Sequence, residues 1–181
     1  MIRIAITGNI ASGKSTVEKI IEELGFKVFD TDKIAHEILE SSEEIKEVFG
    51  TTDRSEIAKI VFNDKEKLTI LENIIHPQVK EKILEIFSKE FKIVFISVPQ
   101  LFEAGFENLF DKIIFVTANV DIRLERLMKR NSLTQKEALI RINAQNDEKD
   151  KINKSDYIIE NNFDENELKI QVKNLLSILI R

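Results

Sequence analysis

The stretch that decides the fold is IRIAITGNIASGKST, residues 2–16, an apolar run that leads into a glycine-framed loop. Residues 8–15 fit the pattern G-x-x-x-x-G-K-[ST] at every required position. The β-branched run predicts a buried strand, and apolar residues at helical spacing in 17–24 predict an amphipathic helix after the loop. Backbone N–H groups and the helix dipole converge on an anion at such a junction, so the stretch is interpreted as a phosphate-binding P-loop.

The residues of this loop have separate expected roles. Gly8 and Gly13 permit backbone conformations and close approaches that a Cβ would obstruct. Lys14 is expected to reach the β- and γ-phosphates, and the hydroxyl of Ser15 is expected to join the coordination shell of Mg²⁺. The predicted ATP-binding residues of the loop are Gly8, Asn9, Ile10, Ala11, Ser12, Gly13, Lys14, Ser15 and Thr16. The alternative interpretation is an ordinary strand-to-helix turn that contains glycine.

Composition narrows the possible functions. The chain has 181 residues, 43% of them hydrophobic and 33% charged, which is typical of one globular, helix-rich domain. The net charge of -5 gives no support to a nonspecific nucleic-acid partner or an anionic membrane. Without cysteine there are no disulfides, Cys-ligated zinc sites or Cys nucleophiles, so metal chemistry would use oxygen ligands. No signal segment or membrane-spanning run is recognised, and we expect a cytoplasmic protein; no oligomeric state is predicted.

Short apolar runs alternate with helical patterns along the chain, which predicts an α/β fold with a parallel sheet of five strands. The expected strands are 2–7, 27–29, 92–98, 112–117 and 157–159. Together they form a core of about 1–33, 92–118 and 155–181 within a single domain, 1–181. The interval 34–91 is too long and too helical for a simple crossover and is expected to be an inserted helical lobe. A second helical insertion, about 119–150, is the expected lid, and Thr134 and Glu137 have capping-box spacing within it.

Acidic residues follow the second expected strand, where the carboxyl end of a parallel strand lies on the ligand side of the sheet. A kinase that phosphorylates a hydroxyl benefits from a carboxylate that orients and deprotonates this nucleophile. Asp32 is the preferred candidate for this base, and Asp30 is interpreted as a Mg²⁺ ligand or a helix cap. The alternative for Asp32 is an ordinary acidic residue in the first turn of a helix.

Arginines accumulate in the expected lid. Arg123, Arg126 and Arg130 share one helix, and Arg141 lies with Gln145 on the next segment. Guanidinium groups that close over a triphosphate would neutralise its charge and exclude water from the reacting phosphoryl group. The alternative is a charge-rich helix that is simply solvated.

Other candidates lie near the third strand and at the middle of the chain. Glu103 offers a carboxylate near the strand end, although a helix-starting acid is the competing interpretation. Phe102 and Phe106 are expected to border the cleft, where they could stack on a base. Pro77 predicts a joint between two helices at His76-Pro77, and a joint residue is the simpler explanation of His76.

These segments together resemble the dephospho-coenzyme A kinase family along nearly the whole chain. The resemblance depends on the P-loop 7–16, on DTDKIA at 30–35 and on IVF at 60–62. It also depends on His76-Pro77, on VPQLFE at 98–103 and on the pair Asn161-Asn162. The resemblance implies a three-layer P-loop kinase fold with an acceptor-binding helical lobe and a helical lid. It further implies transfer of the ATP γ-phosphoryl group to the ribose 3′-hydroxyl of dephospho-coenzyme A, the last step of coenzyme A synthesis.

The resemblance also assigns individual roles. Asp32 matches the base, Lys14 the P-loop lysine, and Arg130 and Arg141 the lid-side arginines that bind ATP, with Arg130 also counted as catalytic. The acceptor-binding candidates are Asp32, His76, Phe102 and Glu103. The chain departs from the family pattern at three positions: Gln100, His36 and Phe163. Two other functions stay open: another P-loop kinase for a nucleoside monophosphate or small hydroxylated metabolite, and a noncatalytic nucleotide-binding switch.

Overall fold

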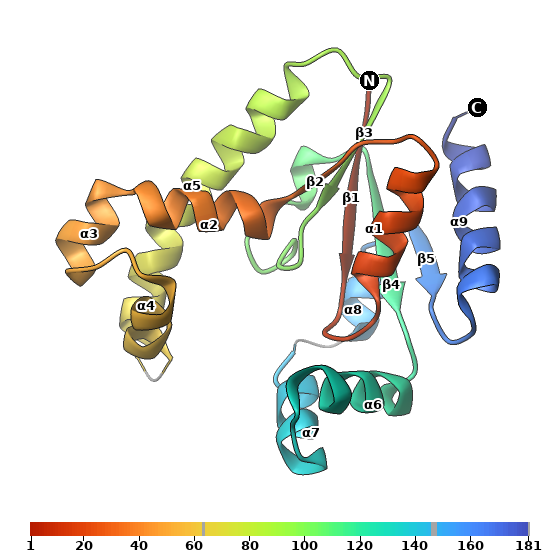
Figure 1. Cartoon of the computed structure of the whole chain (residues 1–181). Coiled ribbons are helices and arrows are strands. Elements are labelled where there is room, and N and C mark those ends of the chain that lie inside the picture. The colour runs from red at the N-terminus through yellow and green to blue at the C-terminus, as the bar shows by residue number, and fades with distance from the viewer. Residues whose placement is uncertain (63, 146–147, 181) are drawn as a thin grey trace. The chain divides into compact units, whose positions relative to one another are not determined.

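The computed structural model describes residues 1–62, 64–145 and 148–180, and Figure 1 traces them from the N-terminus to the C-terminus. The chain forms two compact units. The first consists of residues 1–29 and 92–181, and the second of residues 30–91. The predicted boundary at residue 34 lies inside the second unit.

A five-stranded parallel sheet organises the first unit, as the sequence predicts. Its strands are β1 (Ile2–Gly8), β2 (Val28–Asp30), β3 (Ile93–Ser97), β4 (Lys112–Thr117) and β5 (Tyr157–Glu160), in the order β2-β3-β1-β4-β5. The central strand β1 places Ile6 between Ser97 and Ile114. The predicted strands are therefore confirmed, and their ends differ from the prediction by at most one residue.

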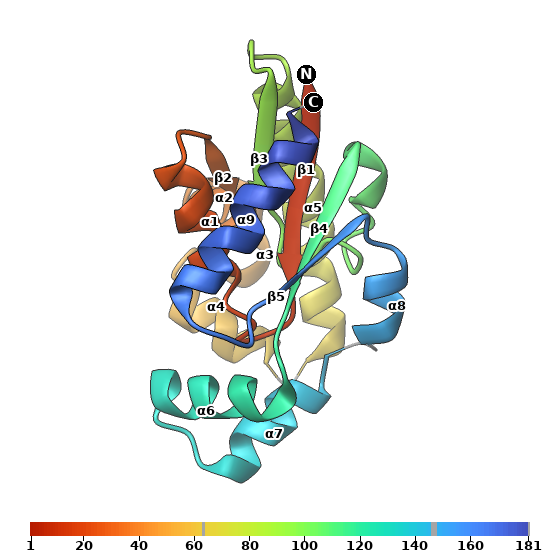
Figure 2. The same cartoon turned by 90° about the vertical axis from the view of Figure 1, so that its right-hand side faces the viewer.

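Two helices pack on one face of this sheet. They are α1 (Lys14–Glu23) and α9 (Glu165–Leu179), which lie side by side in Figure 2 and contact each other. Their apolar stripes meet the buried strand residues in one cluster, which includes Ile4, Phe95, Val17, Ile21 and Val172. Because β1 is buried on both faces, the loop that follows it starts from a rigid base.

The other helices of the first unit follow β4. They are α6 (Val120–Asn131), α7 (Gln135–Asn143) and α8 (Glu148–Asn153), with a short 3₁₀ helix, η1 (Glu107–Leu109), before β4. The predicted capping box of α7 is confirmed, because Thr134 and Glu137 bind each other's backbone N–H groups. Leu127 of α6 forms a buried cluster with the apolar side of α7, and Ile10 and Ala11 of the P-loop pack against this cluster.

The second unit is helical. It contains α2 (Thr31–Ser41), α3 (Glu43–Phe49), α4 (Arg54–Val61) and α5 (Lys65–Phe87). A side chain caps the N-terminus of every one of these helices; the caps are Asp30, Ser42, Asp53 and Asp64. Residues from all four helices share one core, formed by Leu39, Ile45, Ile57, Leu71 and Ile74.

The predicted joint at His76-Pro77 is wrong, because α5 continues through Pro77. Proline lacks the N–H that would bond to the carbonyl of residue 73, which is the reason for predicting a break. Buried side chains lie on both sides of the proline, at Ile74 and Val79, so packing keeps the helix continuous. The side chain of Gln78 donates to the carbonyl of Ile74 at 3.0 Å and adds a local bond at this point.

No helix in the described parts of the chain has both the length and the apolar character needed to cross a membrane.

Candidate active site

The P-loop has the backbone shape of an anion nest. Ala11 and Gly13 both have left-handed conformations, with φ of 60° and 91°. Gly13 is the N-cap of α1, and its carbonyl accepts from the N–H of Thr16 at 2.9 Å. Left-handed residues that alternate with right-handed ones turn successive N–H groups toward one point, where they bind an anion. The loop is therefore built to hold a phosphate at the start of α1.

The space around them requires glycine at both Gly8 and Gly13, and the backbone conformation also requires it at Gly13. A Cβ on Gly8 would collide with the backbone carbonyl of Val116 in the neighbouring strand. A Cβ on Gly13 would collide with the side-chain amide of Asn161, and its φ is unfavourable for any residue with a side chain.

Lys14 and Ser15 stand in the first turn of α1. The ammonium group of Lys14 donates to Glu18 at 2.7 Å and to the hydroxyl of Ser97 at the end of β3. The hydroxyl-bearing Ser15 is exposed. This placement puts a cation and a hydroxyl next to the nest, where a polyphosphate needs both.

Two buried polar atoms in the loop have no hydrogen-bond partner within the described structure. They are Oδ1 of Asn9 and Oγ of Ser12, in residues that are 5% and 1% exposed. Buried polar atoms are nearly always satisfied, and exceptions at a glycine-framed loop point to groups that a ligand or water completes.

The carbonyl of Ser12 is held from outside the loop. Asn161, which follows β5, donates to it through Nδ2 at 2.9 Å, and Arg126 of α6 donates through Nη1 at 3.3 Å. Arg126 also bonds to the backbone carbonyl of Asn161 at 3.1 Å. Burial lowers the pKa of the Arg126 guanidinium, which still stays charged at neutral pH. The pair Asn161-Asn162 was noticed in the sequence, but its contact with the P-loop was not predicted.

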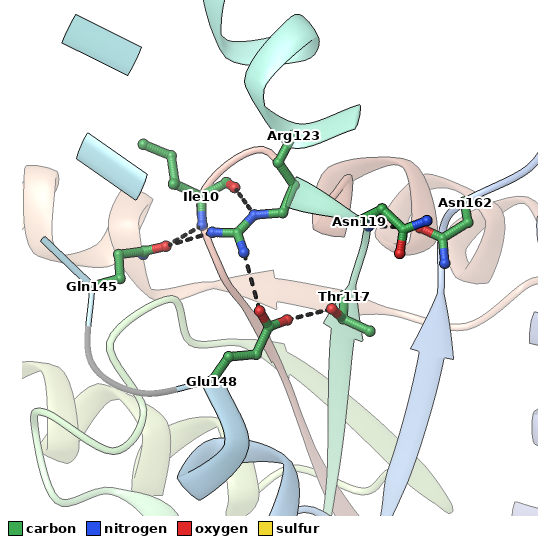
Figure 3. A network of polar contacts seen from close by, with 7 residues as sticks. All are labelled: Ile10, Thr117, Asn119, Arg123, Gln145, Glu148 and Asn162. Carbon is green, nitrogen blue, oxygen red and sulfur yellow. Dashed lines mark hydrogen bonds and ion pairs between the residues drawn. The ribbon is translucent and has the colours of Figure 1, made fainter. Parts of the chain in front are cut away.

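The backbone of Ile10 is held by two further side chains, which Figure 3 shows on either side of it. Gln145 accepts from the N–H of Ile10 at 2.7 Å, and Arg123 donates to its carbonyl at 3.0 Å. The guanidinium of Arg123 also pairs with Glu148 at 3.1 Å. Burial lowers the pKa of Arg123 and the carboxylate of Glu148 partly offsets this effect.

The two arginines that were predicted to bind ATP from the lid, Arg130 and Arg141, make no described contact with the P-loop. Arg130 is exposed and donates to its neighbour Asn131 at 3.0 Å, and Arg141 is exposed on α7. Among the described contacts, the arginines that reach the P-loop are Arg123 and Arg126. The proposed ATP-binding roles of Arg130 and Arg141 stay predictions.

The candidates after β3 form contacts of their own. Glu103 accepts from Lys151 at 2.6 Å, and Lys151 is only 5% exposed. The ammonium group of Lys154 lies 5.8 Å from the centre of the Phe102 ring. Phe106 is buried among the core residues, and its expected stacking on a base stays a prediction.

The candidates in the second unit lie on α2 and α5. Asp30 caps α2 by accepting from the N–H of Asp32 at 2.9 Å, which is one of its two predicted roles. Asp32 is exposed in the first turn of α2. His76 is half-buried inside α5, and His36 pairs with Glu40 at 3.2 Å.

The class of protein follows from the fold and the loop. The structure of shikimate kinase from Bacteroides thetaiotaomicron superposes with a TM-score of 0.60 at 19% sequence identity, and the match covers 99% of each chain. This similarity concerns the fold, which is that of the P-loop kinases.

Closer comparisons give the family. The profile of the dephospho-CoA kinase family matches residues 2–167. Dephospho-CoA kinase of Listeria monocytogenes serovar 1/2a is 41% identical over an alignment of 175 residues that covers 88% of this chain and 88% of its own. The structure of dephospho-CoA kinase from Campylobacter jejuni has a TM-score of 0.77 at 35% identity and covers 98% of this chain and 96% of its own. The chain belongs to the dephospho-CoA kinase family.

Proposed function

We propose that this chain transfers the γ-phosphoryl group of ATP to the ribose 3′-hydroxyl of dephospho-CoA and releases CoA and ADP. The observation that carries the proposal is the P-loop nest, with its two left-handed residues and Lys14 at the start of α1, in a chain of this family. Phosphoryl transfer depends mainly on positioning and charge neutralisation, and the nest supplies both for the donor.

Mg²⁺ fits the residues at the start of α1. Ser15 is exposed there beside Lys14, and the described residues contain no cluster of three or more His, Cys, Asp or Glu side chains that could hold a metal alone. Mg²⁺ is usually held by one or two protein oxygens together with the phosphates of the substrate. When bound, it would neutralise the charge between the β- and γ-phosphates.

The remaining roles are assigned residue by residue. Asp32 is the proposed base, which would accept the proton of the attacking 3′-hydroxyl. Lys14 would neutralise the transferring phosphoryl group, and Arg130 and Arg141 would bind ATP from the lid. Asp32, His76, Phe102 and Glu103 would contact the acceptor. For Glu103 the proposal concerns the second carboxylate oxygen, since Lys151 occupies the first.

The test is a panel of acceptors. ADP release is measured with Mg-ATP and dephospho-CoA, AMP, CMP, shikimate or no acceptor. We expect rapid ADP release when dephospho-CoA is the acceptor and slow release with every other acceptor or with none. Turnover with a different acceptor would indicate another P-loop kinase, and ATP binding without acceptor-dependent turnover would indicate a nucleotide-binding switch. Either result would reject the proposed substrate.

A further inference from the structure

A P-loop binds a polyphosphate through backbone N–H groups that point toward it, and one network of side chains acts on their direction. Its members are Arg123, Gln145, Glu148 and Thr117, which come from α6, the segment before α8, α8 itself and the end of β4. We propose that Arg123, held by Gln145 and Glu148, is a positioning residue that orients the Ile10–Ala11 peptide for binding the triphosphate. This inference rests on the proposed function only in taking ATP as the ligand.

The first step of the argument is the geometry of the peptide group. In a planar trans peptide the C=O of one residue points opposite to the N–H of the next. Arg123 donates through Nε to the carbonyl of Ile10 at 3.0 Å. This bond fixes the direction of the N–H of Ala11, which belongs to the same peptide plane. Gln145 holds the preceding peptide through the N–H of Ile10 at 2.7 Å. Both peptides that flank the Cα of Ile10 are therefore fixed.

The second step is the strain in the loop. Ala11 has a φ of 60°, in the left-handed region that residues with a Cβ seldom adopt. Such a conformation persists only where the surrounding structure enforces it, and it is found preferentially at functional sites. The bonds to Ile10 lie immediately before Ala11, and Ile10 and Ala11 also pack against the buried cluster around Leu127. The network thus supports the strained residue of the nest.

The third step concerns the role of Arg123 itself. Its three nitrogens reach three different acceptors: Nε bonds to Ile10, Nη1 to Glu148 and Nη2 to Gln145 at 3.3 Å. Its side chain is 2% exposed, and the carboxylate of Glu148 neutralises its charge. An arginine engaged in this way acts on phosphate through the backbone of the loop.

The planar guanidinium explains why arginine is suited to this position. Its N–H groups diverge in a rigid fork, whereas the donors of a lysine start from a single atom. Glu148 is fixed in turn by the hydroxyl of Thr117, so the pair is tied to the end of the central sheet. A lysine could restore the ion pair with Glu148 but not the simultaneous bonds to Ile10 and Gln145.

The experiment compares variants of the full chain. Calorimetry measures the affinity for Mg-ATP and, separately, for dephospho-CoA in the wild type, Arg123→Gln, Arg123→Lys and Gln145→Leu. Lys129→Gln is the matched control, because it removes one positive charge from an exposed position on the same helix. Thermal melting checks that each variant is folded.

Arg123→Gln is expected to weaken ATP binding by about 10–100-fold, the effect of losing a hydrogen bond from a charged donor. Arg123→Lys should show nearly the same loss. Gln145→Leu should lose about 3–10-fold, since it removes the neutral hydrogen bond to the Ile10 N–H and only the longest of the Arg123 bonds, at 3.3 Å. Dephospho-CoA affinity should change by less than about 3-fold in all of them, because the network contacts the loop that binds the donor. Lys129→Gln should behave as the wild type. If Arg123→Gln fails to fold, the ATP affinities of Arg123→Lys and Gln145→Leu test the inference in its place.

Three results would overturn the inference. They are unchanged ATP affinity in the folded Arg123 and Gln145 variants, equal losses for ATP and dephospho-CoA, and full rescue by Arg123→Lys, which would leave only a structural ion pair. The proposed function fails in a different way, through a wild type that binds ATP without phosphorylating dephospho-CoA. The comparison of ATP affinities would then still test the positioning network. A wild type without any affinity for ATP would overturn both.

Discussion

Replacing Gly13 with alanine should damage the P-loop far more than the same replacement at Gly25. The two glycines have nearly identical conformations, with φ of 91° and 90°. A Cβ in the left-handed region costs about 1–2 kcal/mol at either position. At Gly13 the Cβ would also displace the amide of Asn161, whose bond to the buried carbonyl of Ser12 is 2.9 Å long. At Gly25 a Cβ would meet nothing within 4 Å.

The magnitude of the difference follows from the lost contact. Leaving the buried amide of Asn161 without its acceptor costs about 1–3 kcal/mol, while Arg126 still donates to the Ser12 carbonyl. The gain from a stiffer unfolded chain, about 0.4–1 kcal/mol, is common to both variants and cancels. Gly13→Ala should therefore lower the free energy of unfolding by about 1–3 kcal/mol more than Gly25→Ala, which keeps strain as its only cost.

Urea unfolding of both variants measures this difference, and calorimetry with Mg-ATP adds a functional reading. Gly13→Ala should weaken ATP binding by at least about 10-fold, because it moves the loop segment whose N–H groups face the phosphates. Gly25→Ala should bind ATP as the wild type does. Equal losses of stability in the two variants, or unchanged ATP affinity in Gly13→Ala, would refute the reasoning from the Asn161 contact.

Three further predictions concern charged side chains. Asp32→Asn should lower kcat by about 10²–10⁴-fold while ATP affinity stays near the wild-type value, as expected of a positioned base; unchanged turnover would assign that role elsewhere. Lys14→Ala should weaken both ATP binding and turnover, because its charge serves the ground state and the transition state, and a variant as active as the wild type would contradict the P-loop assignment. The hydrogen bonds from Arg3 hold the pKa of Asp111 below its usual range. The stabilisation of the folded state by the Asp111 carboxylate is therefore complete above about pH 4 and is lost as the pH falls further. Acid unfolding of Asp111→Asn should consequently depend less on pH below this point, and identical pH profiles for both proteins would exclude the contribution.

The sequence predicted the elements whose signals are local. The strands were predicted from β-branched runs and the P-loop from a complete motif. Both signals depend only on residues that lie close together in the sequence. The capping box at Thr134 and Glu137 is local in the same sense and is confirmed. The error at Pro77 arose because packing on both sides of the proline outweighs the local preference for a break.

The side-chain contacts around the P-loop could not be predicted from local sequence signals. The sequence placed Arg123, Arg126 and Arg130 on one helix, but which of them faces the P-loop depends on how α6 packs. One signal was available: Arg123 precedes the buried Leu127 by four residues and thus shares its apolar face. A charge on such a face indicates an ion-pair partner, which is the partly exposed Glu148. The role of Asp32 stays a prediction.

The most direct measurement of the central claim follows the phosphoryl group itself. The chain is incubated with ATP labelled in the γ-phosphate, Mg²⁺ and dephospho-CoA, and the product is isolated and treated with a 3′-nucleotidase. We expect the label in CoA and its complete release by this enzyme, since the phosphoryl group is placed on the ribose 3′-oxygen. Label that stays in ATP, appears only as free phosphate or resists the 3′-nucleotidase would contradict the account.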